Sequence, residues 1–168
     1  CSFASYADQK DKRLNDLFRI LSYSEDVREI NSVTAIIWDI WLETNDPLIT
    51  IDFEKGLQSM KNGQLKESIK IFTKVIKNKP NFAEAWNKRA TVYYLIGDFD
   101  SSIIDIKQTL KLEPRHFGAM DGLGLIFIHL QQLENAIDVY DQMLNIFPNN
   151  ISVIQKRKRL MKLISKST

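Results

Sequence analysis

Residues 83–116, AEAWNKRATVYYLIGDFDSSIIDIKQTLKLEPRH, decide the fold of this 168-residue chain. Apolar residues in this stretch recur at helical spacing on both sides of Gly97 and Asp98, which predicts two helices joined by a tight turn. The same pattern appears once before this stretch and once after it. Each copy closes on a proline, at equal intervals of 34 residues: Pro80, Pro114 and Pro148. A fixed period of this length is typical of a stacked repeat protein.

Each copy also has a small residue at its eighth position, namely Gly56, Ala90 and Gly124. Antiparallel helices joined by a short turn approach each other closely, and a large side chain at this position would push them apart. We therefore assign these three residues a structural role in helix packing.

The three segments resemble tetratricopeptide repeats, with boundaries at 49–82, 83–116 and 117–150. The central copy carries nearly the whole pattern: Trp86, Ala90, Tyr93, Gly97, Phe99, Ile103, Leu110 and Pro114. The third copy follows with Leu123, Gly124, Phe127, Leu133, Ala136, Tyr140 and Pro148. The resemblance implies an all-α, right-handed solenoid of three helix-turn-helix repeats.

The first copy is the weakest, since Asp52, Lys55 and Ser59 stand where bulky apolar residues are usual in this family. Residues 151–165 resemble the polar helix that caps such arrays, with one apolar stripe and many cations on its other faces. An electrostatic contact with anionic lipid or an acidic partner is the alternative for these cations.

Residues 10–45 predict a helical hairpin before the repeats. The first helix covers about 10–22, and the second begins at Ser24 and runs to about Glu43. The second helix contains Trp38 and Trp41 among too many apolar residues to leave exposed, so both are assigned to the core. We expect the hairpin to stack against the first repeat and to cover the open end of the array.

Composition excludes several classes of protein. With 44% hydrophobic and 26% charged residues, the chain fits one compact domain or a short solenoid. A net charge of +2 is too near neutral to indicate a nucleic-acid partner. The sequence contains no run of 18 apolar residues, the length that a helix needs to span a bilayer. Cys1 is the only cysteine, which excludes an internal disulfide.

Residues 1–9 resemble the end of a secretory signal, with Ser5 and Ala7 at the places of small residues before a cleavage site. An arbitrary fragment boundary and a lipid-modified Cys1 are two other interpretations. The hairpin followed by three repeats, with residues 86–91 and 113–119, is similar to small secreted tetratricopeptide repeat proteins of alphaproteobacteria. This resemblance implies a periplasmic or secreted location rather than a cytoplasmic one.

No pattern in the sequence indicates a catalytic, metal or cofactor site. His116 and His129 lack an HExxH or CxxC context, and we interpret both as ordinary surface or helix-end histidines. Gly118, Gly122 and Gly124 form GxxxGxG, but the repeat register places them inside a helix and not in a phosphate loop. We therefore expect neither an enzyme nor a cofactor.

Arg89 occupies a position that faces the second helix of its repeat, where many repeats have leucine. Repeats with arginine here often carry aspartate at the place of Asp105, and this copy has it. We predict a structural ion pair between Arg89 and Asp105, because a charge at such a position needs a partner.

The first helices of successive repeats line the concave side of such a solenoid. The repeat register places these candidate partner-binding residues there: Phe53, Leu57, Asn87, Thr91, Tyr94, Leu95, Asp121, Leu125 and Ile128. Chaperone-binding members of the family hold a terminal carboxylate with a Lys/Asn/Arg clamp at these positions, and only Asn87 matches it. Burial of Phe53 and Leu57 against the hairpin is an alternative to ligand contact.

We interpret the chain as a non-catalytic protein–protein interaction module, an adaptor or assembly scaffold that binds a peptide or protein segment in this groove. The alternative is a self-associating structural protein that uses the groove or the hairpin face as a homo-oligomer interface.

Overall fold

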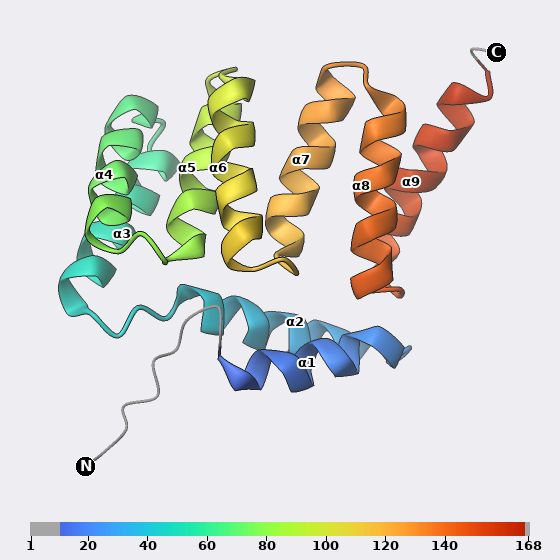
Figure 1. Cartoon of the computed structure of the whole chain (residues 1–168), viewed down its shortest axis with the longest axis horizontal. Coiled ribbons are helices and arrows are strands. Elements are labelled where there is room, and N and C mark those ends of the chain that lie inside the picture. Colours follow the sequence, from blue (N-terminus) through green and yellow to red (C-terminus); the bar gives the residue numbers. More distant parts are fainter. Residues whose placement is uncertain (1–10, 167–168) are drawn as a thin grey trace.

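The computed structural model describes residues 11–166, and these residues fold into nine helices (Figure 1). In chain order the helices are α1 (Lys12–Tyr23), α2 (Val27–Leu42), α3 (Pro47–Lys61), α4 (Leu65–Asn78), α5 (Ala83–Leu95), α6 (Phe99–Leu112), α7 (Phe117–His129), α8 (Leu133–Ile146) and α9 (Ile151–Ile164). Helices α3 to α8 form three pairs that stand side by side, with α9 next to α8. The predicted all-α solenoid of helix-turn-helix repeats is confirmed. The expected signal remnant, residues 1–9, lies outside the described residues.

Left-handed backbone at one position makes the turn within each helix pair. Gly63 and Gly97 adopt φ values of 73° and 80° in the first two turns, a conformation that costs glycine little. In the third turn the residue 34 positions after Gly97 is Gln131, with φ of 58°. A side chain in this conformation costs about 1–2 kcal/mol, so the third turn is the strained one.

The helices of a pair meet closely at the small eighth residue of each repeat. A Cβ atom on Gly56 would lie 2.7 Å from the ring of Phe72, and one on Gly124 would lie 2.7 Å from Tyr140 Cζ. Ser102 Oγ donates to the carbonyl of Ala90 at 2.8 Å, which ties α6 to α5 at the same level. These contacts give the three positions their structural role.

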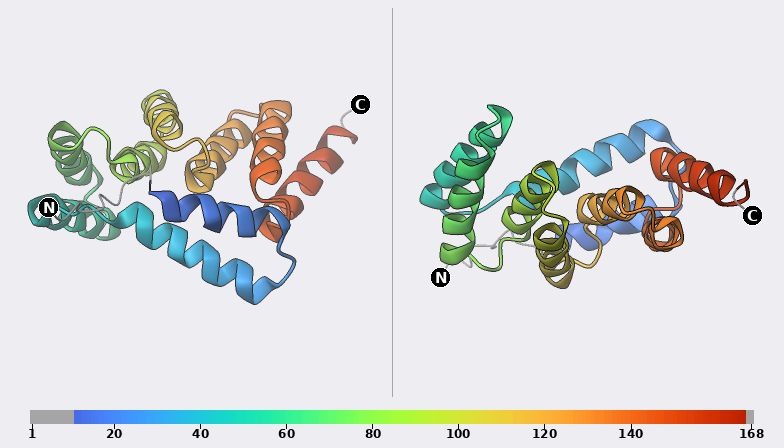
Figure 2. Two further views of the ribbon diagram at one scale, coloured as in Figure 1. Left: turned by 60° about the horizontal axis from the view of Figure 1, so that its bottom comes forward. Right: turned by 90° about the horizontal axis from the view of Figure 1, so that it is seen from above.

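The hairpin formed by α1 and α2 does not stack on the first repeat, and that expectation is wrong. Figures 1 and 2 show the two helices running along one edge of the array, across the ends of the repeat helices. Their contacts are with α5, α7 and α8, and Leu48 and Ile51 of α3 stay 74% and 47% exposed. In α3 the polar Gln58 replaces the buried Val92 and Ile126 of later repeats, so the end of the array is a poor apolar surface.

The hairpin instead buries its apolar stripe at the edge where the inter-repeat loops lie. Leu14, Phe18 and Trp41 share one core cluster with Phe117 and Phe147. The second helix starts later than expected, because its N-cap is Asp26 and not Ser24. The Asp26 side chain accepts a hydrogen bond from the backbone N–H of Arg28.

All three inter-repeat loops are hydrogen bonded to the hairpin or the linker after it. Lys79 Nζ donates to the carbonyl of Thr44, and Arg115 Nη1 donates to Asn15 Oδ1 at 2.9 Å. Asn149 Nδ2 donates to the carbonyl of Ser24 at 2.7 Å. The hairpin and its linker are therefore bonded to all three repeats.

Candidate functional site

A cavity of about 280 Å³ lies between α5, α6 and α7. We call it the α5–α7 cavity. It is lined by Asn87, Ala90, Thr91, Tyr94, Leu95, Ser102, Ile106, Gly118, Asp121, Gly122 and Leu125. Six of the nine predicted partner-binding residues are among them: Asn87, Thr91, Tyr94, Leu95, Asp121 and Leu125.

Apolar side chains form the open part of this cavity. Leu95 is 54% exposed and Leu125 is 37% exposed, although both are large hydrophobic residues. Tyr94 packs its ring against Phe99, with 5.7 Å between the ring centroids, and so stands as a fixed wall. Exposed apolar groups around a hollow are typical of a surface that binds another molecule.

The two polar residues of α5 in the cavity use their hydrogen-bonding groups within the protein. Asn87 is buried, and its Nδ2 donates to Glu84 Oε2 at 3.1 Å. Thr91 Oγ1 donates to the backbone carbonyl of Asn87 at 3.0 Å. These groups shape the cavity wall more than they offer donors to a ligand.

The charges at the cavity are paired with opposite charges. Asp121 Oδ1 lies 2.5 Å from Lys156 Nζ of α9, and each side chain is 31% exposed. Next to Asn87, Lys88 Nζ lies 2.8 Å from the fully buried Glu84 Oε1. Beneath Asp121, burial raises the pKa of Tyr140 and the Asp121 charge raises it further, so this phenol stays neutral. The cavity consequently carries little net charge.

Three predicted contact residues do not line the cavity. Phe53 is only 3% exposed and packs in the core of the first repeat, with ring centroids 5.5 Å from Phe72 and 4.9 Å from Phe82. Leu57 packs against the same cluster, and Ile128 packs against the cluster around the hairpin. Phe53 is therefore a core residue and not a ligand contact, and its partners are in the first repeat instead of the hairpin.

The residues that form the floor of the cavity were not predicted from the repeat register. Ser102 and Ile106 come from α6, and second helices normally lie on the convex side, so the register gave no reason to choose them. Gly118 and Gly122 had a visible signal, the GxxxGxG pattern. A Cβ atom on Gly122 would point toward Ile106 of the cavity, at 3.6 Å from its Cδ1, whereas one on Gly118 would point toward Trp38 of the hairpin.

His116 is fully buried, so it is not a surface histidine, but the interpretation as a helix-end residue is confirmed because His116 is the N-cap of α7. Its Nδ1 accepts the backbone N–H of Ala119 at 3.2 Å and so caps α7, while Nε2 lies 2.9 Å from Glu84 Oε2. The acceptor role of Nδ1 places the proton on Nε2, which donates to the carboxylate. The imidazole also stacks on Trp41 of the hairpin, with 4.0 Å between centroids and planes 10° apart.

Trp38 lies next to this cluster and meets α7 at Gly118. A Cβ atom on Gly118 would be 2.6 Å from Trp38 Cη2, so only glycine allows this approach. Lys88 Nζ lies 5.4 Å from the centre of the Trp38 ring. The hairpin thus packs on α7 at Gly118, but no residue of α1 or α2 lines the α5–α7 cavity.

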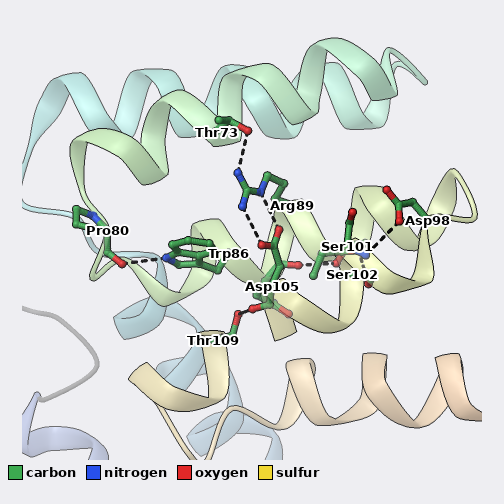
Figure 3. Close-up of polar contacts among 12 residues, drawn as sticks. Thr73, Pro80, Trp86, Arg89, Asp98, Ser101, Ser102, Asp105 and Thr109 are labelled. Carbon is green, nitrogen blue, oxygen red and sulfur yellow. Dashed lines mark hydrogen bonds and ion pairs between the residues drawn. The ribbon is translucent and has the colours of Figure 1, made fainter. Parts of the chain in front are cut away.

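Arg89 and Asp105 form the expected ion pair on the opposite side of α5 (Figure 3). Arg89 Nε and Nη2 donate to the two carboxylate oxygens of Asp105 at 2.7 and 2.8 Å, and Nη1 donates to Thr73 Oγ1 at 2.9 Å. Burial alone would lower the pKa of Arg89, but the pair with Asp105 raises it. The arrangement links α4, α5 and α6 and is structural.

The described residues contain no group of three or more His, Cys, Asp or Glu side chains placed to hold a metal ion. Between residues 11 and 166, no helix has the length and hydropathy to cross a bilayer.

Comparison with known proteins finds relatives that contain similar helical repeats. A TPR repeat-containing protein of Rhizobium etli is 27% identical over 137 residues, which are 82% of this chain and 67% of that protein. The Hsp70-Hsp90 organizing protein 1 of Glycine max is 25% identical over 115 residues, 68% of this chain but only 20% of that protein. This chain thus corresponds to about a fifth of the organizing protein.

Solved structures share the arrangement of helices. The first TPR of Spaghetti (RPAP3), bound to the HSP90 peptide SRMEEVD, superposes with a TM-score of 0.65 at 24% identity and covers 70% of this chain and 93% of that one. The Sgt2 TPR domain from Aspergillus fumigatus gives a TM-score of 0.66 at 16% identity, over 73% and 82%. At these identities the likeness concerns the fold.

The family model described as tetratricopeptide repeat matches residues 53–107 and 96–151, together more than half of the chain. With the three helical pairs and their small eighth residues, this match shows that the chain belongs to the tetratricopeptide repeat family.

Proposed function

We propose that this protein is a non-catalytic adaptor that binds a peptide or protein segment in the α5–α7 cavity. The observation that carries the proposal is the pair of exposed apolar side chains, Leu95 and Leu125, on either side of a hollow of about 280 Å³. The relatives support it, because a TPR domain with a similar arrangement of helices is bound to an HSP90 peptide.

The preferred ligand is an uncharged apolar segment. The positions of a carboxylate clamp hold Thr91, Asp121 and Leu125 beside Asn87, and the lysines nearest the cavity, Lys88 and Lys156, already face Glu84 and Asp121. An acidic terminus would have to compete with these internal carboxylates for each cation. Apolar side chains of a ligand would instead bury favourable apolar surface against Leu95, Leu125 and the ring of Tyr94.

A peptide display selection on the folded protein, followed by fluorescence anisotropy, tests this function. We expect selected peptides rich in apolar residues, with similar Kd values for free and amidated C-termini and at low and high salt. The Tyr94→Ala/Leu125→Ala double variant should weaken binding by about tenfold or more, since two apolar contacts are truncated.

Ile104→Ala is the matched control, because Ile104 is 64% exposed but lies on α6 outside the cavity lining. It should leave the Kd unchanged. If the acidic peptide SRMEEVD binds more tightly than the selected peptides, or if the double variant binds as well as the wild type, the proposed ligand or the proposed site is wrong.

A further inference from the structure

The junction between α7 and α9 is filled by one long side chain. Helix α9 begins 34 residues after α7, so the two helices can be compared position by position in the repeat register. At the sixth position α9 has Lys156, whose Nζ lies 2.5 Å from Asp121 Oδ1 of α7. The same Nζ lies 5.8 Å from the centre of the Tyr140 ring of α8. A lysine of α9 thus crosses to the neighbouring first helix over the second helix between them.

The junction between α5 and α7 lacks such a side chain, because its sixth position is Gly122. Asn87 of α5 stands in the place of Asp121, and both Asn87 and Gly122 line the α5–α7 cavity. Ile106 of α6 stands in the place of Tyr140 and forms part of the floor. A Cβ atom on Gly122 would lie 3.6 Å from Ile106 Cδ1, so a side chain at this position would start into the cavity. The hollow is therefore the space that Lys156 takes at the next junction.

The polar groups around this hollow do not match a charged guest side chain. Asn87 offers a neutral amide where α7 offers a carboxylate, and its Nδ2 already donates to Glu84 Oε2 at 3.1 Å. Asp121 also lines the cavity, but its Oδ1 faces Lys156. A guest ammonium or guanidinium would lose its water and would have to compete for a carboxylate that is already paired. The hollow consequently suits an uncharged side chain.

The shape of the hollow suits a flat side chain. Gly118 and Gly122 lie about one turn apart on α7, so at both places α7 lines the cavity with backbone atoms only. From α5 comes the ring of Tyr94, which is fixed against Phe99 at 5.7 Å between centroids. The volume of about 280 Å³ lies just below the roughly 300–1,000 Å³ of pockets for drug-sized ligands, so there is room for one large side chain. A planar ring can lie against bare backbone and buries a large apolar area.

We propose that the α5–α7 cavity receives one aromatic side chain of the partner, in the space that Lys156 takes at the next junction. This inference rests on the function proposed above and adds the class of the anchoring residue. The rest of the bound segment lies across Leu95 and Leu125, the exposed apolar side chains of the cavity. An aromatic anchor in a pocket commonly supplies most of the binding energy of such a segment.

A titration with indole, the side chain of tryptophan, tests the pocket without any peptide. In proton–nitrogen NMR spectra of the full chain we expect saturable shifts of the backbone amides of Gly118, Gly122 and Ile106. The Kd should be on the order of 1 mM or below, because indole has few atoms with which to gain affinity. n-Butylamine, which carries the positive charge of a lysine side chain, should not saturate these shifts.

Gly122→Met should abolish the shifts that indole causes. Its side chain starts toward Ile106 and fills the hollow from within. Ile104→Met is the matched control, since it places a methionine at a 64% exposed position of α6 outside the cavity lining. It should keep the indole Kd of the wild type. Circular dichroism and the urea midpoint show whether both variants are folded.

Peptides from the display selection test the anchor itself. Alanine in place of the aromatic residue of a peptide should weaken its binding to the wild type by about tenfold or more. The same replacement should have almost no effect on binding to Gly122→Met, because in this variant the ring has no space to enter. This double-mutant cycle measures whether the aromatic residue and the space at Gly122 act together.

The anchor and the proposed function can fail separately. If peptides lose affinity with Tyr94→Ala/Leu125→Ala but not with Gly122→Met, the segment lies over the cavity without entering it, and only the anchor proposal is wrong. If neither variant weakens the peptides, the cavity is not their binding site and both proposals fail. Indole shifts that persist in Gly122→Met, or saturation by n-butylamine at the same amides, would also overturn the aromatic anchor.

Discussion

Glu84 shows how burial and hydrogen bonding oppose each other at one side chain. Burial alone would raise its pKa, but the hydrogen bond from His116 and the charge of Lys88 outweigh burial and hold the pKa below its ordinary value of 4.5. The carboxylate therefore binds a proton less readily in the folded protein than in the unfolded chain. Its contribution to stability is present above pH 4.5 and is lost as the pH falls toward the folded pKa.

We expect the urea midpoint of the wild type to fall as the pH is lowered below about 4.5, and that of Glu84→Gln to fall less steeply. The comparison isolates Glu84, because other groups such as Asp11 also have a lowered pKa and titrate in both proteins. The measurement is a series of urea unfolding curves between pH 7 and pH 3. Parallel curves for the two proteins would contradict the assignment.

At this scale, the sequence allows some contacts to be predicted and hides others. The Arg89–Asp105 pair could be inferred, because both residues lie in one repeat and a fixed register brings them together. The burial of His116 could not, because its partners Glu84 and Trp41 come from the preceding first helix and from the hairpin. A single histidine carries no local signal of such distant neighbours.

At the scale of elements, the seat of α2 on α7 can be tested with two glycines of the same helix. Gly118→Ala places a Cβ 2.6 Å from Trp38 Cη2, inside a rigid aromatic cluster, and should destabilise by about 1–3 kcal/mol. Gly122→Ala meets only Ile106 Cδ1, at 3.6 Å, and should stabilise by about 0.5–1 kcal/mol through helix propensity.

Urea unfolding followed by circular dichroism measures both variants. Tryptophan fluorescence in a Trp86→Phe background, where the remaining tryptophans Trp38 and Trp41 both lie in the hairpin, reports separately whether the hairpin has shifted. Equal gains in stability from the two alanines would mean that Trp38 does not pack tightly on α7.

The helices of the repeats were predictable, whereas the docking of one element on another was not. Periodicity, turn glycines and closing prolines are local signals, and each repeat provides them again. The position of the hairpin depends on which surface best matches its aromatic stripe, and Phe117 and His116 form that surface only after α5 to α8 have stacked. The same limit hid the α6 floor of the cavity.

At the scale of the whole molecule, the hairpin changes how the array should unfold. In a simple solenoid each repeat contacts only its neighbours, so the ends can open while the centre stays folded. Here the hairpin and its linker bind the loops after α4, α6 and α8 through Lys79, Arg115 and Asn149. Opening of the central repeats requires these distant contacts to break together.

Trp41→Ala should therefore weaken the protection of α5, α7 and α8 from hydrogen exchange together with that of α1 and α2. The indole is fully buried between Phe18, His116 and Phe117, and its loss should cost about 3–5 kcal/mol. Trp86→Ala is the control, because Trp86 packs against the core of the first repeat and should lower protection around α4 and α5 only. If Trp41→Ala exposes α1 and α2 while α5 to α8 keep their protection, the hairpin is an appendage, and the cooperativity of the array comes from its repeats alone.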